Sequence, residues 1–385
     1  MLTRRNFLRS IGMGAAAGAA IATSGFPLEA FEPPRHGQVV DAKTALGAAR
    51  SGAILLNSNE NAYGPLPTGA AAMQQALTWA NRYPDFDYDA LVGAVCDLHK
   101  VKTTQVVTGC GSTEILRVGA ASLLGPGKKL IVPHPTFEAI AEYAGATGAE
   151  VVKLPLTSGY AHDLDAMLAQ AASVPSLIYI CNPNNPTASL TPRKDLDTFL
   201  SKLPNHSYVL IDEAYHHFAI DSPEYVSVLD RPPDNPRVIV ARTFSKIYGM
   251  AGLRLGYGIS SPDTAQRLRK LQTQDNVNMI AAQAAVASLE DRVETQTAIR
   301  RNATDRLEFF TQAARRGLKP IPSFANFVMM DASRPATQVT NYFKQNGILI
   351  GRRFPLMENF VRVSLGRPNE MQQFWKVWDT LKASS

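Results

Sequence analysis

The chain has 385 residues, of which 45% are hydrophobic and 19% are charged, and its formal net charge is +6. A chain of this length can bury a large core and is expected to divide into two domains, and its composition is that of a globular protein. Residues 1–30 hold three arginines and one glutamate, so they supply +2 and leave +4 for the remainder, which has no basic run interleaved with aromatic residues. We therefore expect no nucleic-acid partner.

The N-terminus has the pattern of an export signal. The stretch TRRNFLR (3–9) is followed by a mildly apolar run rich in alanine and glycine. This order resembles a twin-arginine signal, and the run is too short and too weakly apolar to predict a stable membrane anchor. We predict an export signal over residues 1–30, cleaved after Ala22 or Ala30, and a periplasmic location. Without a functional signal the protein would be cytoplasmic.

An N-terminal arm is expected over residues 31–58, and it leads into a loop rich in asparagine, glycine and proline. A helix is predicted over 68–80. After a break, a second helix is predicted to run to His99, with Asp87 or Asp89 as its N-cap.

Residues 105–124 predict a strand, a glycine turn and a helix that begins at Ser112 or Thr113. Backbone N–H groups and the helix dipole at such a start form an anion site. An ordinary strand–helix turn would show the same pattern, so the motif alone is weak. Residues 129–156 then predict a strand, a helix and a strand.

Three apolar runs follow, and each predicts a buried strand that ends in polar residues. They lie within 176–188, 207–218 and 237–241, and residues 253–260 predict a further strand that is either antiparallel or at an edge. Because strands alternate with helical segments, we predict an α/β fold with a mostly parallel sheet. Ligands bind beyond the carboxyl ends of such strands. The polar residues expected at these ends are Gly111–Thr113, Asn185, Asp212, Tyr215 and Ser245–Lys246.

The C-terminal part has the pattern of a smaller α+β domain. Residues 274–316 predict two helices with a break near residue 290. Strands are predicted over 323–331 and 360–366, and helices over 337–347 and 369–383.

The cysteines and histidines give no sign of a metal site or a disulfide framework. Cys96, Cys110 and Cys181 are odd in number and widely spaced, without histidines at metal-site intervals. We expect buried thiols. His216 and His217 have no third ligand nearby in sequence, so we interpret them as structural and predict no metal.

Lys246, just past the 237–241 strand, has the surroundings expected of an amine that binds a phosphate-bearing carbonyl cofactor. Thr243 and Ser245 precede it, and Arg254 follows eight residues on. An amine of this kind forms a Schiff base with an aldehyde, and hydroxyls and a guanidinium can bind the phosphate. The alternative is an exposed loop lysine.

An ordered set of motifs supports the interpretation of Lys246 as the amine that binds the cofactor. The motifs are NENAYG (59–64), RYPD (82–85), GCGSTE (109–114), PTF (135–137), NPNNPT (182–187), DEAY (212–215), TFSK (243–246), GLRLGY (252–257) and VRVSLG (361–366). With them the chain resembles the pyridoxal-phosphate aminotransferases of class I and II, fold type I, and within these the histidinol-phosphate aminotransferase-like group. The resemblance covers residues 53–383. It implies a seven-stranded type of sheet in a large domain over 59–285, and a small α+β domain over 286–385. Ala62 stands where this family usually has proline, and Ala188 where it usually has glycine.

The resemblance also implies roles for single residues. Lys246 would form the Schiff base with pyridoxal 5'-phosphate and then move the substrate proton. Asp212 would face the pyridine nitrogen and keep the ring protonated. Tyr215 and Asn185 would bond the phenolate oxygen, and Phe137 would stack on the ring. The phosphate would be held by Ser112, Thr113, Thr243, Ser245 and Arg254.

On the substrate side, the resemblance implies that Arg362 binds the α-carboxylate through a two-bond fork, which lysine cannot form. Tyr63 and Asn185 would contact the substrate as well, and Arg352 would bind a distal phosphate or carboxylate. Tyr83 would reach the phosphate of a neighbouring subunit. The resemblance therefore implies a homodimer with shared active sites.

The predicted function is transfer of an amino group between an amino acid and a 2-oxo acid. Histidine biosynthesis is not expected of an exported protein, so we favour another donor, such as an aromatic amino acid. One alternative is a decarboxylase or lyase on the same scaffold, because fold and cofactor do not fix the reaction. The other is a non-catalytic exported binding protein, against which Lys246, Asp212 and Arg254 together argue.

Overall fold

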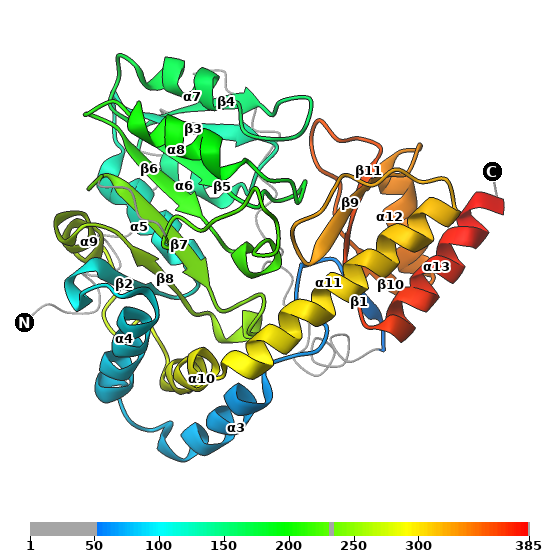
Figure 1. Cartoon of the computed structure of the whole chain (residues 1–385), viewed down its shortest axis with the longest axis horizontal. Helices are drawn as coiled ribbons and strands as arrows, with labels where there is room; N and C mark the ends of the chain where they lie inside the picture. The colour runs from blue at the N-terminus through cyan, green and yellow to red at the C-terminus, as the bar shows by residue number, and fades with distance from the viewer. Residues whose placement is uncertain (1–51, 231–234, 384–385) are drawn as a thin grey trace, which may run out of the picture. The chain divides into compact units, whose positions relative to one another are not determined.

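The computed structural model describes residues 52–230 and 235–383. It divides the chain into two units, and the second, Ala53–Ser385, holds every described helix and strand (Figure 1). The predicted export signal (1–30) and residues 31–51 of the predicted arm lie outside the described residues.

A seven-stranded sheet forms the larger part of this unit (Figure 1). Its strands are parallel except for β8, which runs antiparallel to both of its neighbours, β2 and β7. The predicted α/β fold with a mostly parallel sheet is thus confirmed, and the 253–260 strand is antiparallel and inside the sheet. In spatial order the strands are β2 (Val106–Gly109), β8 (Gly256–Ile259), β7 (Val238–Thr243), β6 (Tyr208–Asp212), β5 (Ser176–Cys181), β3 (Lys129–His134) and β4 (Glu150–Pro155).

The central strands β5, β6 and β7 read as near-continuous apolar runs because helices cover both faces of the sheet. Alternate residues of each strand enter opposite core clusters, as the strand period of two requires. One face packs against α4 (Asp85–His99), α7 (Leu164–Ala171) and α8 (Arg193–Ser201), and α10 (Met279–Glu290) joins the same core by packing against α4. The other packs against α5 (Ser112–Leu123), α6 (Ala139–Gly145) and α9 (Pro262–Arg269). Between β1 (Ile54–Leu56) and α4 the chain adds α3 (Pro67–Ala76) and the short helix η2 (Leu77–Trp79).

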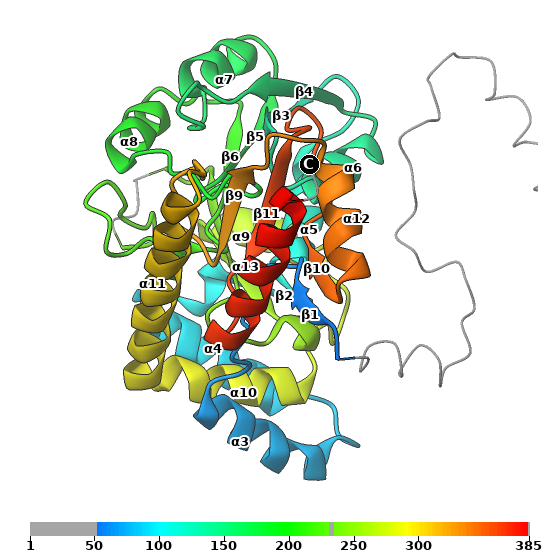
Figure 2. The same cartoon turned by 90° about the vertical axis from the view of Figure 1, so that its right-hand side faces the viewer.

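A second region has its own core and two short sheets. β9 (Phe327–Asp331) pairs antiparallel with β11 (Phe360–Ser364), and β1 (Ile54–Leu56) pairs parallel with β10 (Ile348–Ile350). Figure 2 shows its helices side by side in front of β9 and β11. These helices are α11 (Arg292–Arg315), α12 (Ala336–Gln345) and α13 (Pro368–Ala383). The end of the predicted arm therefore forms a strand with C-terminal residues, and the predicted domain boundaries stay predictions.

Two predictions of helix starts need correction. α4 begins at Asp85 after Pro84, which makes no side-chain cap bond, so neither Asp87 nor Asp89 is the N-cap. Asp85 and Asp87 instead lie in the first turn, where negative charge favours the helix dipole. The long helical stretch starts at Met279 rather than 274, and its predicted break is confirmed at Asp291, whose side chain accepts from the Glu294 N–H.

The cysteine prediction also needs correction. Cys181 is buried as expected, but Cys96 is partly exposed and Cys110 is exposed. Cys110 lies in the tight turn before α5, where its backbone N–H is bonded to Glu114 at 2.7 Å and its side chain has no core to enter. In the described part of the chain, no helix combines the length and apolar character needed to cross a bilayer.

We predict that Phe374→Ala lowers the free energy of unfolding by about 3–5 kcal/mol, as expected for removing a buried aromatic ring. Phe374 is fully buried, with its ring centroid 4.9 Å from those of both Phe343 and Trp375. Urea unfolding measures the change. The control Leu307→Ala removes a side chain that is 69% exposed and should stay within about 0.5 kcal/mol of wild type. Equal losses in the two variants would contradict this core assignment.

Candidate active site

A cavity of about 320 Å³ lies beyond the carboxyl ends of β5, β6 and β7, where the second region adds Arg362. It gathers residues that are far apart in the sequence, as the strand-end argument predicts. Eleven of the residues singled out from the sequence line it: Ser112, Thr113, Phe137, Asn185, Asp212, Tyr215, Thr243, Ser245, Lys246, Arg254 and Arg362.

One end of the cavity is built to bind an anion. Ser112 is the first residue of α5, so its helix start presents free N–H groups and the positive end of the dipole. Thr243 donates to Ser245 at 2.9 Å, and Arg254 donates to the same hydroxyl at 3.4 Å. Gly111 has φ +76°, and a side chain there would collide with the Arg254 guanidinium. The backbone at position 111 and the Arg254 side chain can approach each other this closely only because glycine has no side chain.

Lys246 lies at the wall of the cavity, between buried neighbours Phe244 and Ile247. Its Nζ donates to the Asn59 carbonyl at 3.0 Å and lies 5.4 Å from the centre of the Tyr215 ring. Burial, followed by the Arg362 cation, lowers the pKa of Lys246 to about 8. The amine is therefore far more often neutral near neutral pH than an ordinary lysine, as a nucleophile or base requires.

Asp212 ends β6 and is buried at the cavity. One carboxylate oxygen accepts from the Tyr179 hydroxyl at 2.9 Å, and the other accepts from the Ala214 N–H at 3.1 Å. Burial raises the pKa of Asp212 to about 6, against the opposing effect of these two donors. Above that pH a carboxylate faces the cavity with too few partners, and a protonated ring nitrogen would supply the missing donor.

Tyr215 and Asn185 line the same cavity as Lys246 and Asp212. The Tyr215 hydroxyl accepts from Asn59 Nδ2 at 3.0 Å, and burial raises the pKa of Tyr215 so that it keeps its own proton to donate. Asn185 is buried and accepts from Arg362 Nη1 at 2.7 Å through Oδ1. Both side chains can therefore contact a ligand oxygen in the cavity.

Arg362, on β11, is buried with one free donor. Nη1 is bonded to Asn185, Nη2 donates to the Asn57 carbonyl at 2.7 Å, and Nε has no partner among the described residues. Its guanidinium carbon lies 5.0 Å from the centre of the Phe354 ring. Burial lowers the pKa of Arg362 to about 10, so it stays charged near neutral pH. A buried cation with an unused donor suits a small anion such as a carboxylate.

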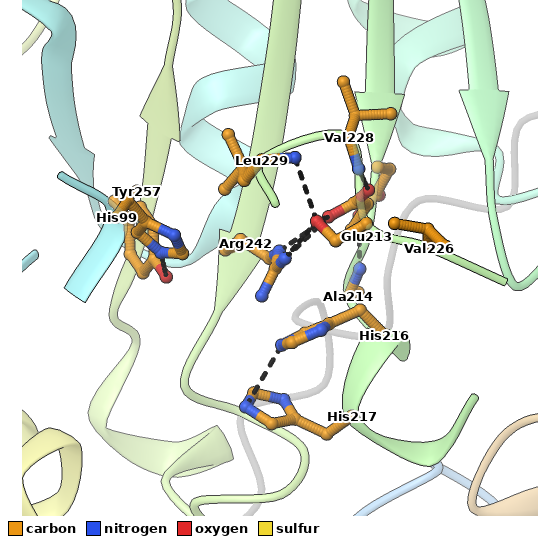
Figure 3. A network of polar contacts seen from close by, with 12 residues as sticks. His99, Glu213, Ala214, His216, His217, Val226, Val228, Leu229, Arg242 and Tyr257 are labelled. Carbon is orange, nitrogen blue, oxygen red and sulfur yellow. Dashed lines mark hydrogen bonds and ion pairs between the residues drawn. The ribbon is translucent and has the colours of Figure 1, made fainter. Parts of the chain in front are cut away.

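A second buried network is centred on Glu213, the residue that follows Asp212 (Figure 3). Glu213 accepts from Arg242 Nε at 2.8 Å, from Ser227 at 2.7 Å and from the Val228 N–H at 2.8 Å. Because both charges are buried and hydrogen-bonded to each other, removing one partner would be strongly destabilising. Sequence reasoning missed Arg242, Tyr179 and Asn59, although a polar residue inside an apolar strand was a signal for the first two.

The two histidines extend this network. The Nε2 atoms of His216 and His217 lie 3.1 Å apart, and Figure 3 shows His216 below the Arg242 side chain. Burial, followed by Arg242, holds the pKa of both well below its usual value. Within residues 52–230 and 235–383, no group of three or more His, Cys, Asp or Glu side chains is placed to hold a metal ion.

Three predicted site residues lie outside this cavity. Tyr63 donates to Asp305 at 3.0 Å beside a smaller neighbouring cavity, and Tyr83 is 79% exposed. Arg352 is exposed, forms an ion pair with Glu138 and stacks on Phe354. Their predicted roles stay predictions.

The cavity fits pyridoxal phosphate on the chemistry of its lining. It offers an anion-binding end, an amine with lowered pKa and a buried carboxylate that lacks a donor, and the aromatic side chain of Phe137 is part of its lining. Ser112, Thr113, Thr243, Ser245 and Arg254 could hold the phosphate, Asp212 the ring nitrogen, and Tyr215 with Asn185 the phenolate oxygen. Arg362 remains for a substrate carboxylate.

The chain matches the family described as aminotransferase class I and II over residues 51–377. It is 37% identical to a histidinol-phosphate aminotransferase of Symbiobacterium thermophilum, covering 83% of this chain and 88% of that one. It is 36% identical to an aromatic amino acid aminotransferase of Cutibacterium acnes, covering 77% and 84%. Among solved structures, a histidinol-phosphate aminotransferase of Sinorhizobium meliloti in complex with pyridoxal-5'-phosphate superposes with a TM-score of 0.81 at 27% identity, covering 93% and 99%.

The family match spans most of the chain, and the relatives are matched over most of their own length. The fold and the cavity agree with that membership. The chain belongs to the class I and II aminotransferases and is an enzyme that uses pyridoxal phosphate to transfer an amino group between an amino acid and a 2-oxo acid.

Proposed function

We propose that this aminotransferase takes its amino group from an aromatic amino acid rather than from histidinol phosphate. The observation that carries the proposal is the ion pair between Arg352 and Glu138, the residue that follows the cavity-lining Phe137. A distal phosphate on the substrate would have to displace the Glu138 carboxylate to reach this cation. Phe354, which packs against both Arg352 and Arg362, instead supports an apolar ring. The relatives carry both names at similar identity, so identity alone does not choose between them.

We assign the roles of the site residues as follows. Bound pyridoxal phosphate supplies an electron-withdrawing ring that makes the substrate Cα–H acidic. Lys246 Nζ would be the group that accepts and later donates this proton, since its lowered pKa suits a base near neutral pH. Asp212 would bind the ring nitrogen, and Arg362 would bind the α-carboxylate and so orient the substrate at Lys246.

We predict that phenylalanine, tyrosine and tryptophan are better amino donors to 2-oxoglutarate than histidinol phosphate, measured as glutamate formed. Because Glu138 occupies Arg352, histidinol phosphate cannot make a charge-assisted contact between its phosphate and Arg352. Such a contact is worth about 1.5–3 kcal/mol, or roughly tenfold to a hundredfold in kcat/KM. Lys246→Ala is the inactive control. Carbon dioxide release without glutamate would favour the decarboxylase alternative, and no turnover of any donor would favour the binding protein.

Glu138→Gln sharpens this donor test because it frees Arg352 without removing it. The variant should gain activity with histidinol phosphate while its activity with phenylalanine changes little. The matched control is Glu142→Gln on the same helix, which leaves the Arg352–Glu138 pair in place. If wild type already prefers histidinol phosphate, the proposed donor is wrong.

We predict that Arg362→Lys raises KM for the amino acid by roughly tenfold to a hundredfold and also lowers kcat, because lysine keeps the charge but loses the two-bond fork. The visible spectrum of the bound cofactor should barely change, since its own anchors lie elsewhere in the cavity. Arg353→Lys is the matched control, because Arg353 is an exposed arginine paired with Glu358. Unchanged kinetics in Arg362→Lys would contradict the carboxylate role.

We further propose a homodimer in which Tyr83 serves the neighbouring active site. Trp79, Tyr83 and Phe86 are 60%, 79% and 90% exposed and close together in sequence, which is unusual for large apolar side chains and typical of an interaction surface. Light scattering would show a dimer, and Tyr83→Phe should weaken cofactor retention. A monomer that retains full activity would contradict this proposal.

Export by a twin-arginine signal is proposed on the stretch TRRNFLR before an uncharged run rich in alanine and glycine. Replacing Arg4 and Arg5 by lysine should retain the protein in the cytoplasm, as seen by cell fractionation. An unchanged distribution would show that this N-terminus is not such a signal.

A further inference from the structure

Tyr179 is a polar side chain in the middle of an apolar strand. β5 reads Ser-Leu-Ile-Tyr-Ile-Cys, and each of its six residues is buried. Leu177, Tyr179 and Cys181 enter one core cluster, while Ile178 and Ile180 enter the other. A phenylalanine or leucine would fill the same space, so the hydroxyl needs a separate explanation.

Among the described residues, the Tyr179 hydroxyl is bonded to the carboxylate of Asp212, which lines the cavity. Tyr179 pairs with Leu210 in the β5–β6 ladder, and Asp212 stands two residues further on the same face. Such a diagonal neighbour is within reach of an aromatic side chain. The Tyr179 hydroxyl donates to Asp212 Oδ2 at 2.9 Å, and Tyr179 is itself fully buried.

The hydrogen bond from Tyr179 orients the Asp212 carboxylate and favours its ionised form. With the Ala214 N–H on Oδ1 and Tyr179 on Oδ2, rotation of the carboxylate would break two hydrogen bonds. Tyr179 is also the largest of the influences that lower the pKa of Asp212 against its burial. Burial and the neighbouring Asp212 raise the pKa of Tyr179 well above its usual value, so the phenol remains a donor.

We propose that Tyr179 is a positioning residue for the transamination, holding the Asp212 carboxylate ionised and oriented toward the ring nitrogen of pyridoxal phosphate. The inference rests on the role proposed above for Asp212. Tyr179 is not among the residues that line the cavity, so its effect on the reaction would pass through Asp212.

Tyr179→Phe tests the proposal, since it removes one oxygen and keeps the ring in place. The apoenzyme is titrated with pyridoxal phosphate over a pH series. In wild type the affinity should fall as pH drops through about 6, because Asp212 then takes up a proton. Without the Tyr179 hydroxyl this midpoint should move upward by about one pH unit, the equivalent of a tenfold change. The cofactor's own ionisations are common to both titrations, so the difference reports Asp212.

The loaded enzyme gives a second readout. In Tyr179→Phe, kcat should fall by roughly tenfold to a hundredfold, as for loss of a hydrogen bond to a charged group, while KM for the amino acid changes little. The matched control is Tyr257→Phe, which removes a buried hydroxyl from the same sheet that is bonded to His99 at 2.8 Å. It should leave the pH midpoint in place.

If Tyr179→Phe fails to fold, 3,5-difluorotyrosine at position 179 carries the test. Its more acidic hydroxyl is a stronger donor, so the midpoint should move to lower pH. A wild-type midpoint that neither variant moves would overturn the role of Tyr179 alone. A wild-type apoenzyme that binds no pyridoxal phosphate would instead overturn the proposed function of the whole site.

Discussion

The site depends on keeping three ionisable groups, Asp212, Lys246 and Arg362, out of bulk water at one cavity. Charges in such a place are costly unless each has hydrogen-bonding partners. Asp212 has the Tyr179 hydroxyl and the Ala214 N–H, Lys246 has the Asn59 carbonyl, and Arg362 has Asn185 and the Asn57 carbonyl. The same desolvation moves the pKa of Lys246 to about 8 and that of Asp212 to about 6, toward the range where proton transfer is useful.

Asn59 connects the sheet to the second region. Its N–H donates to Ser364 on β11 at 2.8 Å, its Nδ2 donates to Tyr215 at 3.0 Å, and its carbonyl accepts from Lys246 and from Asn326. The buried residue has φ 54°, a conformation that asparagine tolerates better than most residues. A single loop residue thereby fixes the lysine, the tyrosine and the strand that carries Arg362 relative to one another.

Residues at strand ends could be predicted from the sequence because each buried strand is an apolar run, and the first polar residues after the run mark where the strand ends. Ser112, Asp212 and Lys246 were found in this way. Tyr179 and Arg242 are polar residues within apolar strands, which is a signal in the sequence, but their partners could not be predicted because they come from other strands and register is not readable from one chain segment. β10 was missed because three residues directly after a helix give no periodicity. The left-handed φ of 59° at the buried Ala188 gives a physical reason for the glycine usual there.

The central claim is that Lys246 is the amine that holds pyridoxal phosphate in this cavity. Borohydride reduction of the loaded enzyme, followed by proteolysis and mass spectrometry, locates that amine directly. We expect one labelled peptide, with the reduced cofactor on Lys246 and loss of the label in Lys246→Ala. A label on another lysine, or a loaded enzyme that takes none, would contradict the account.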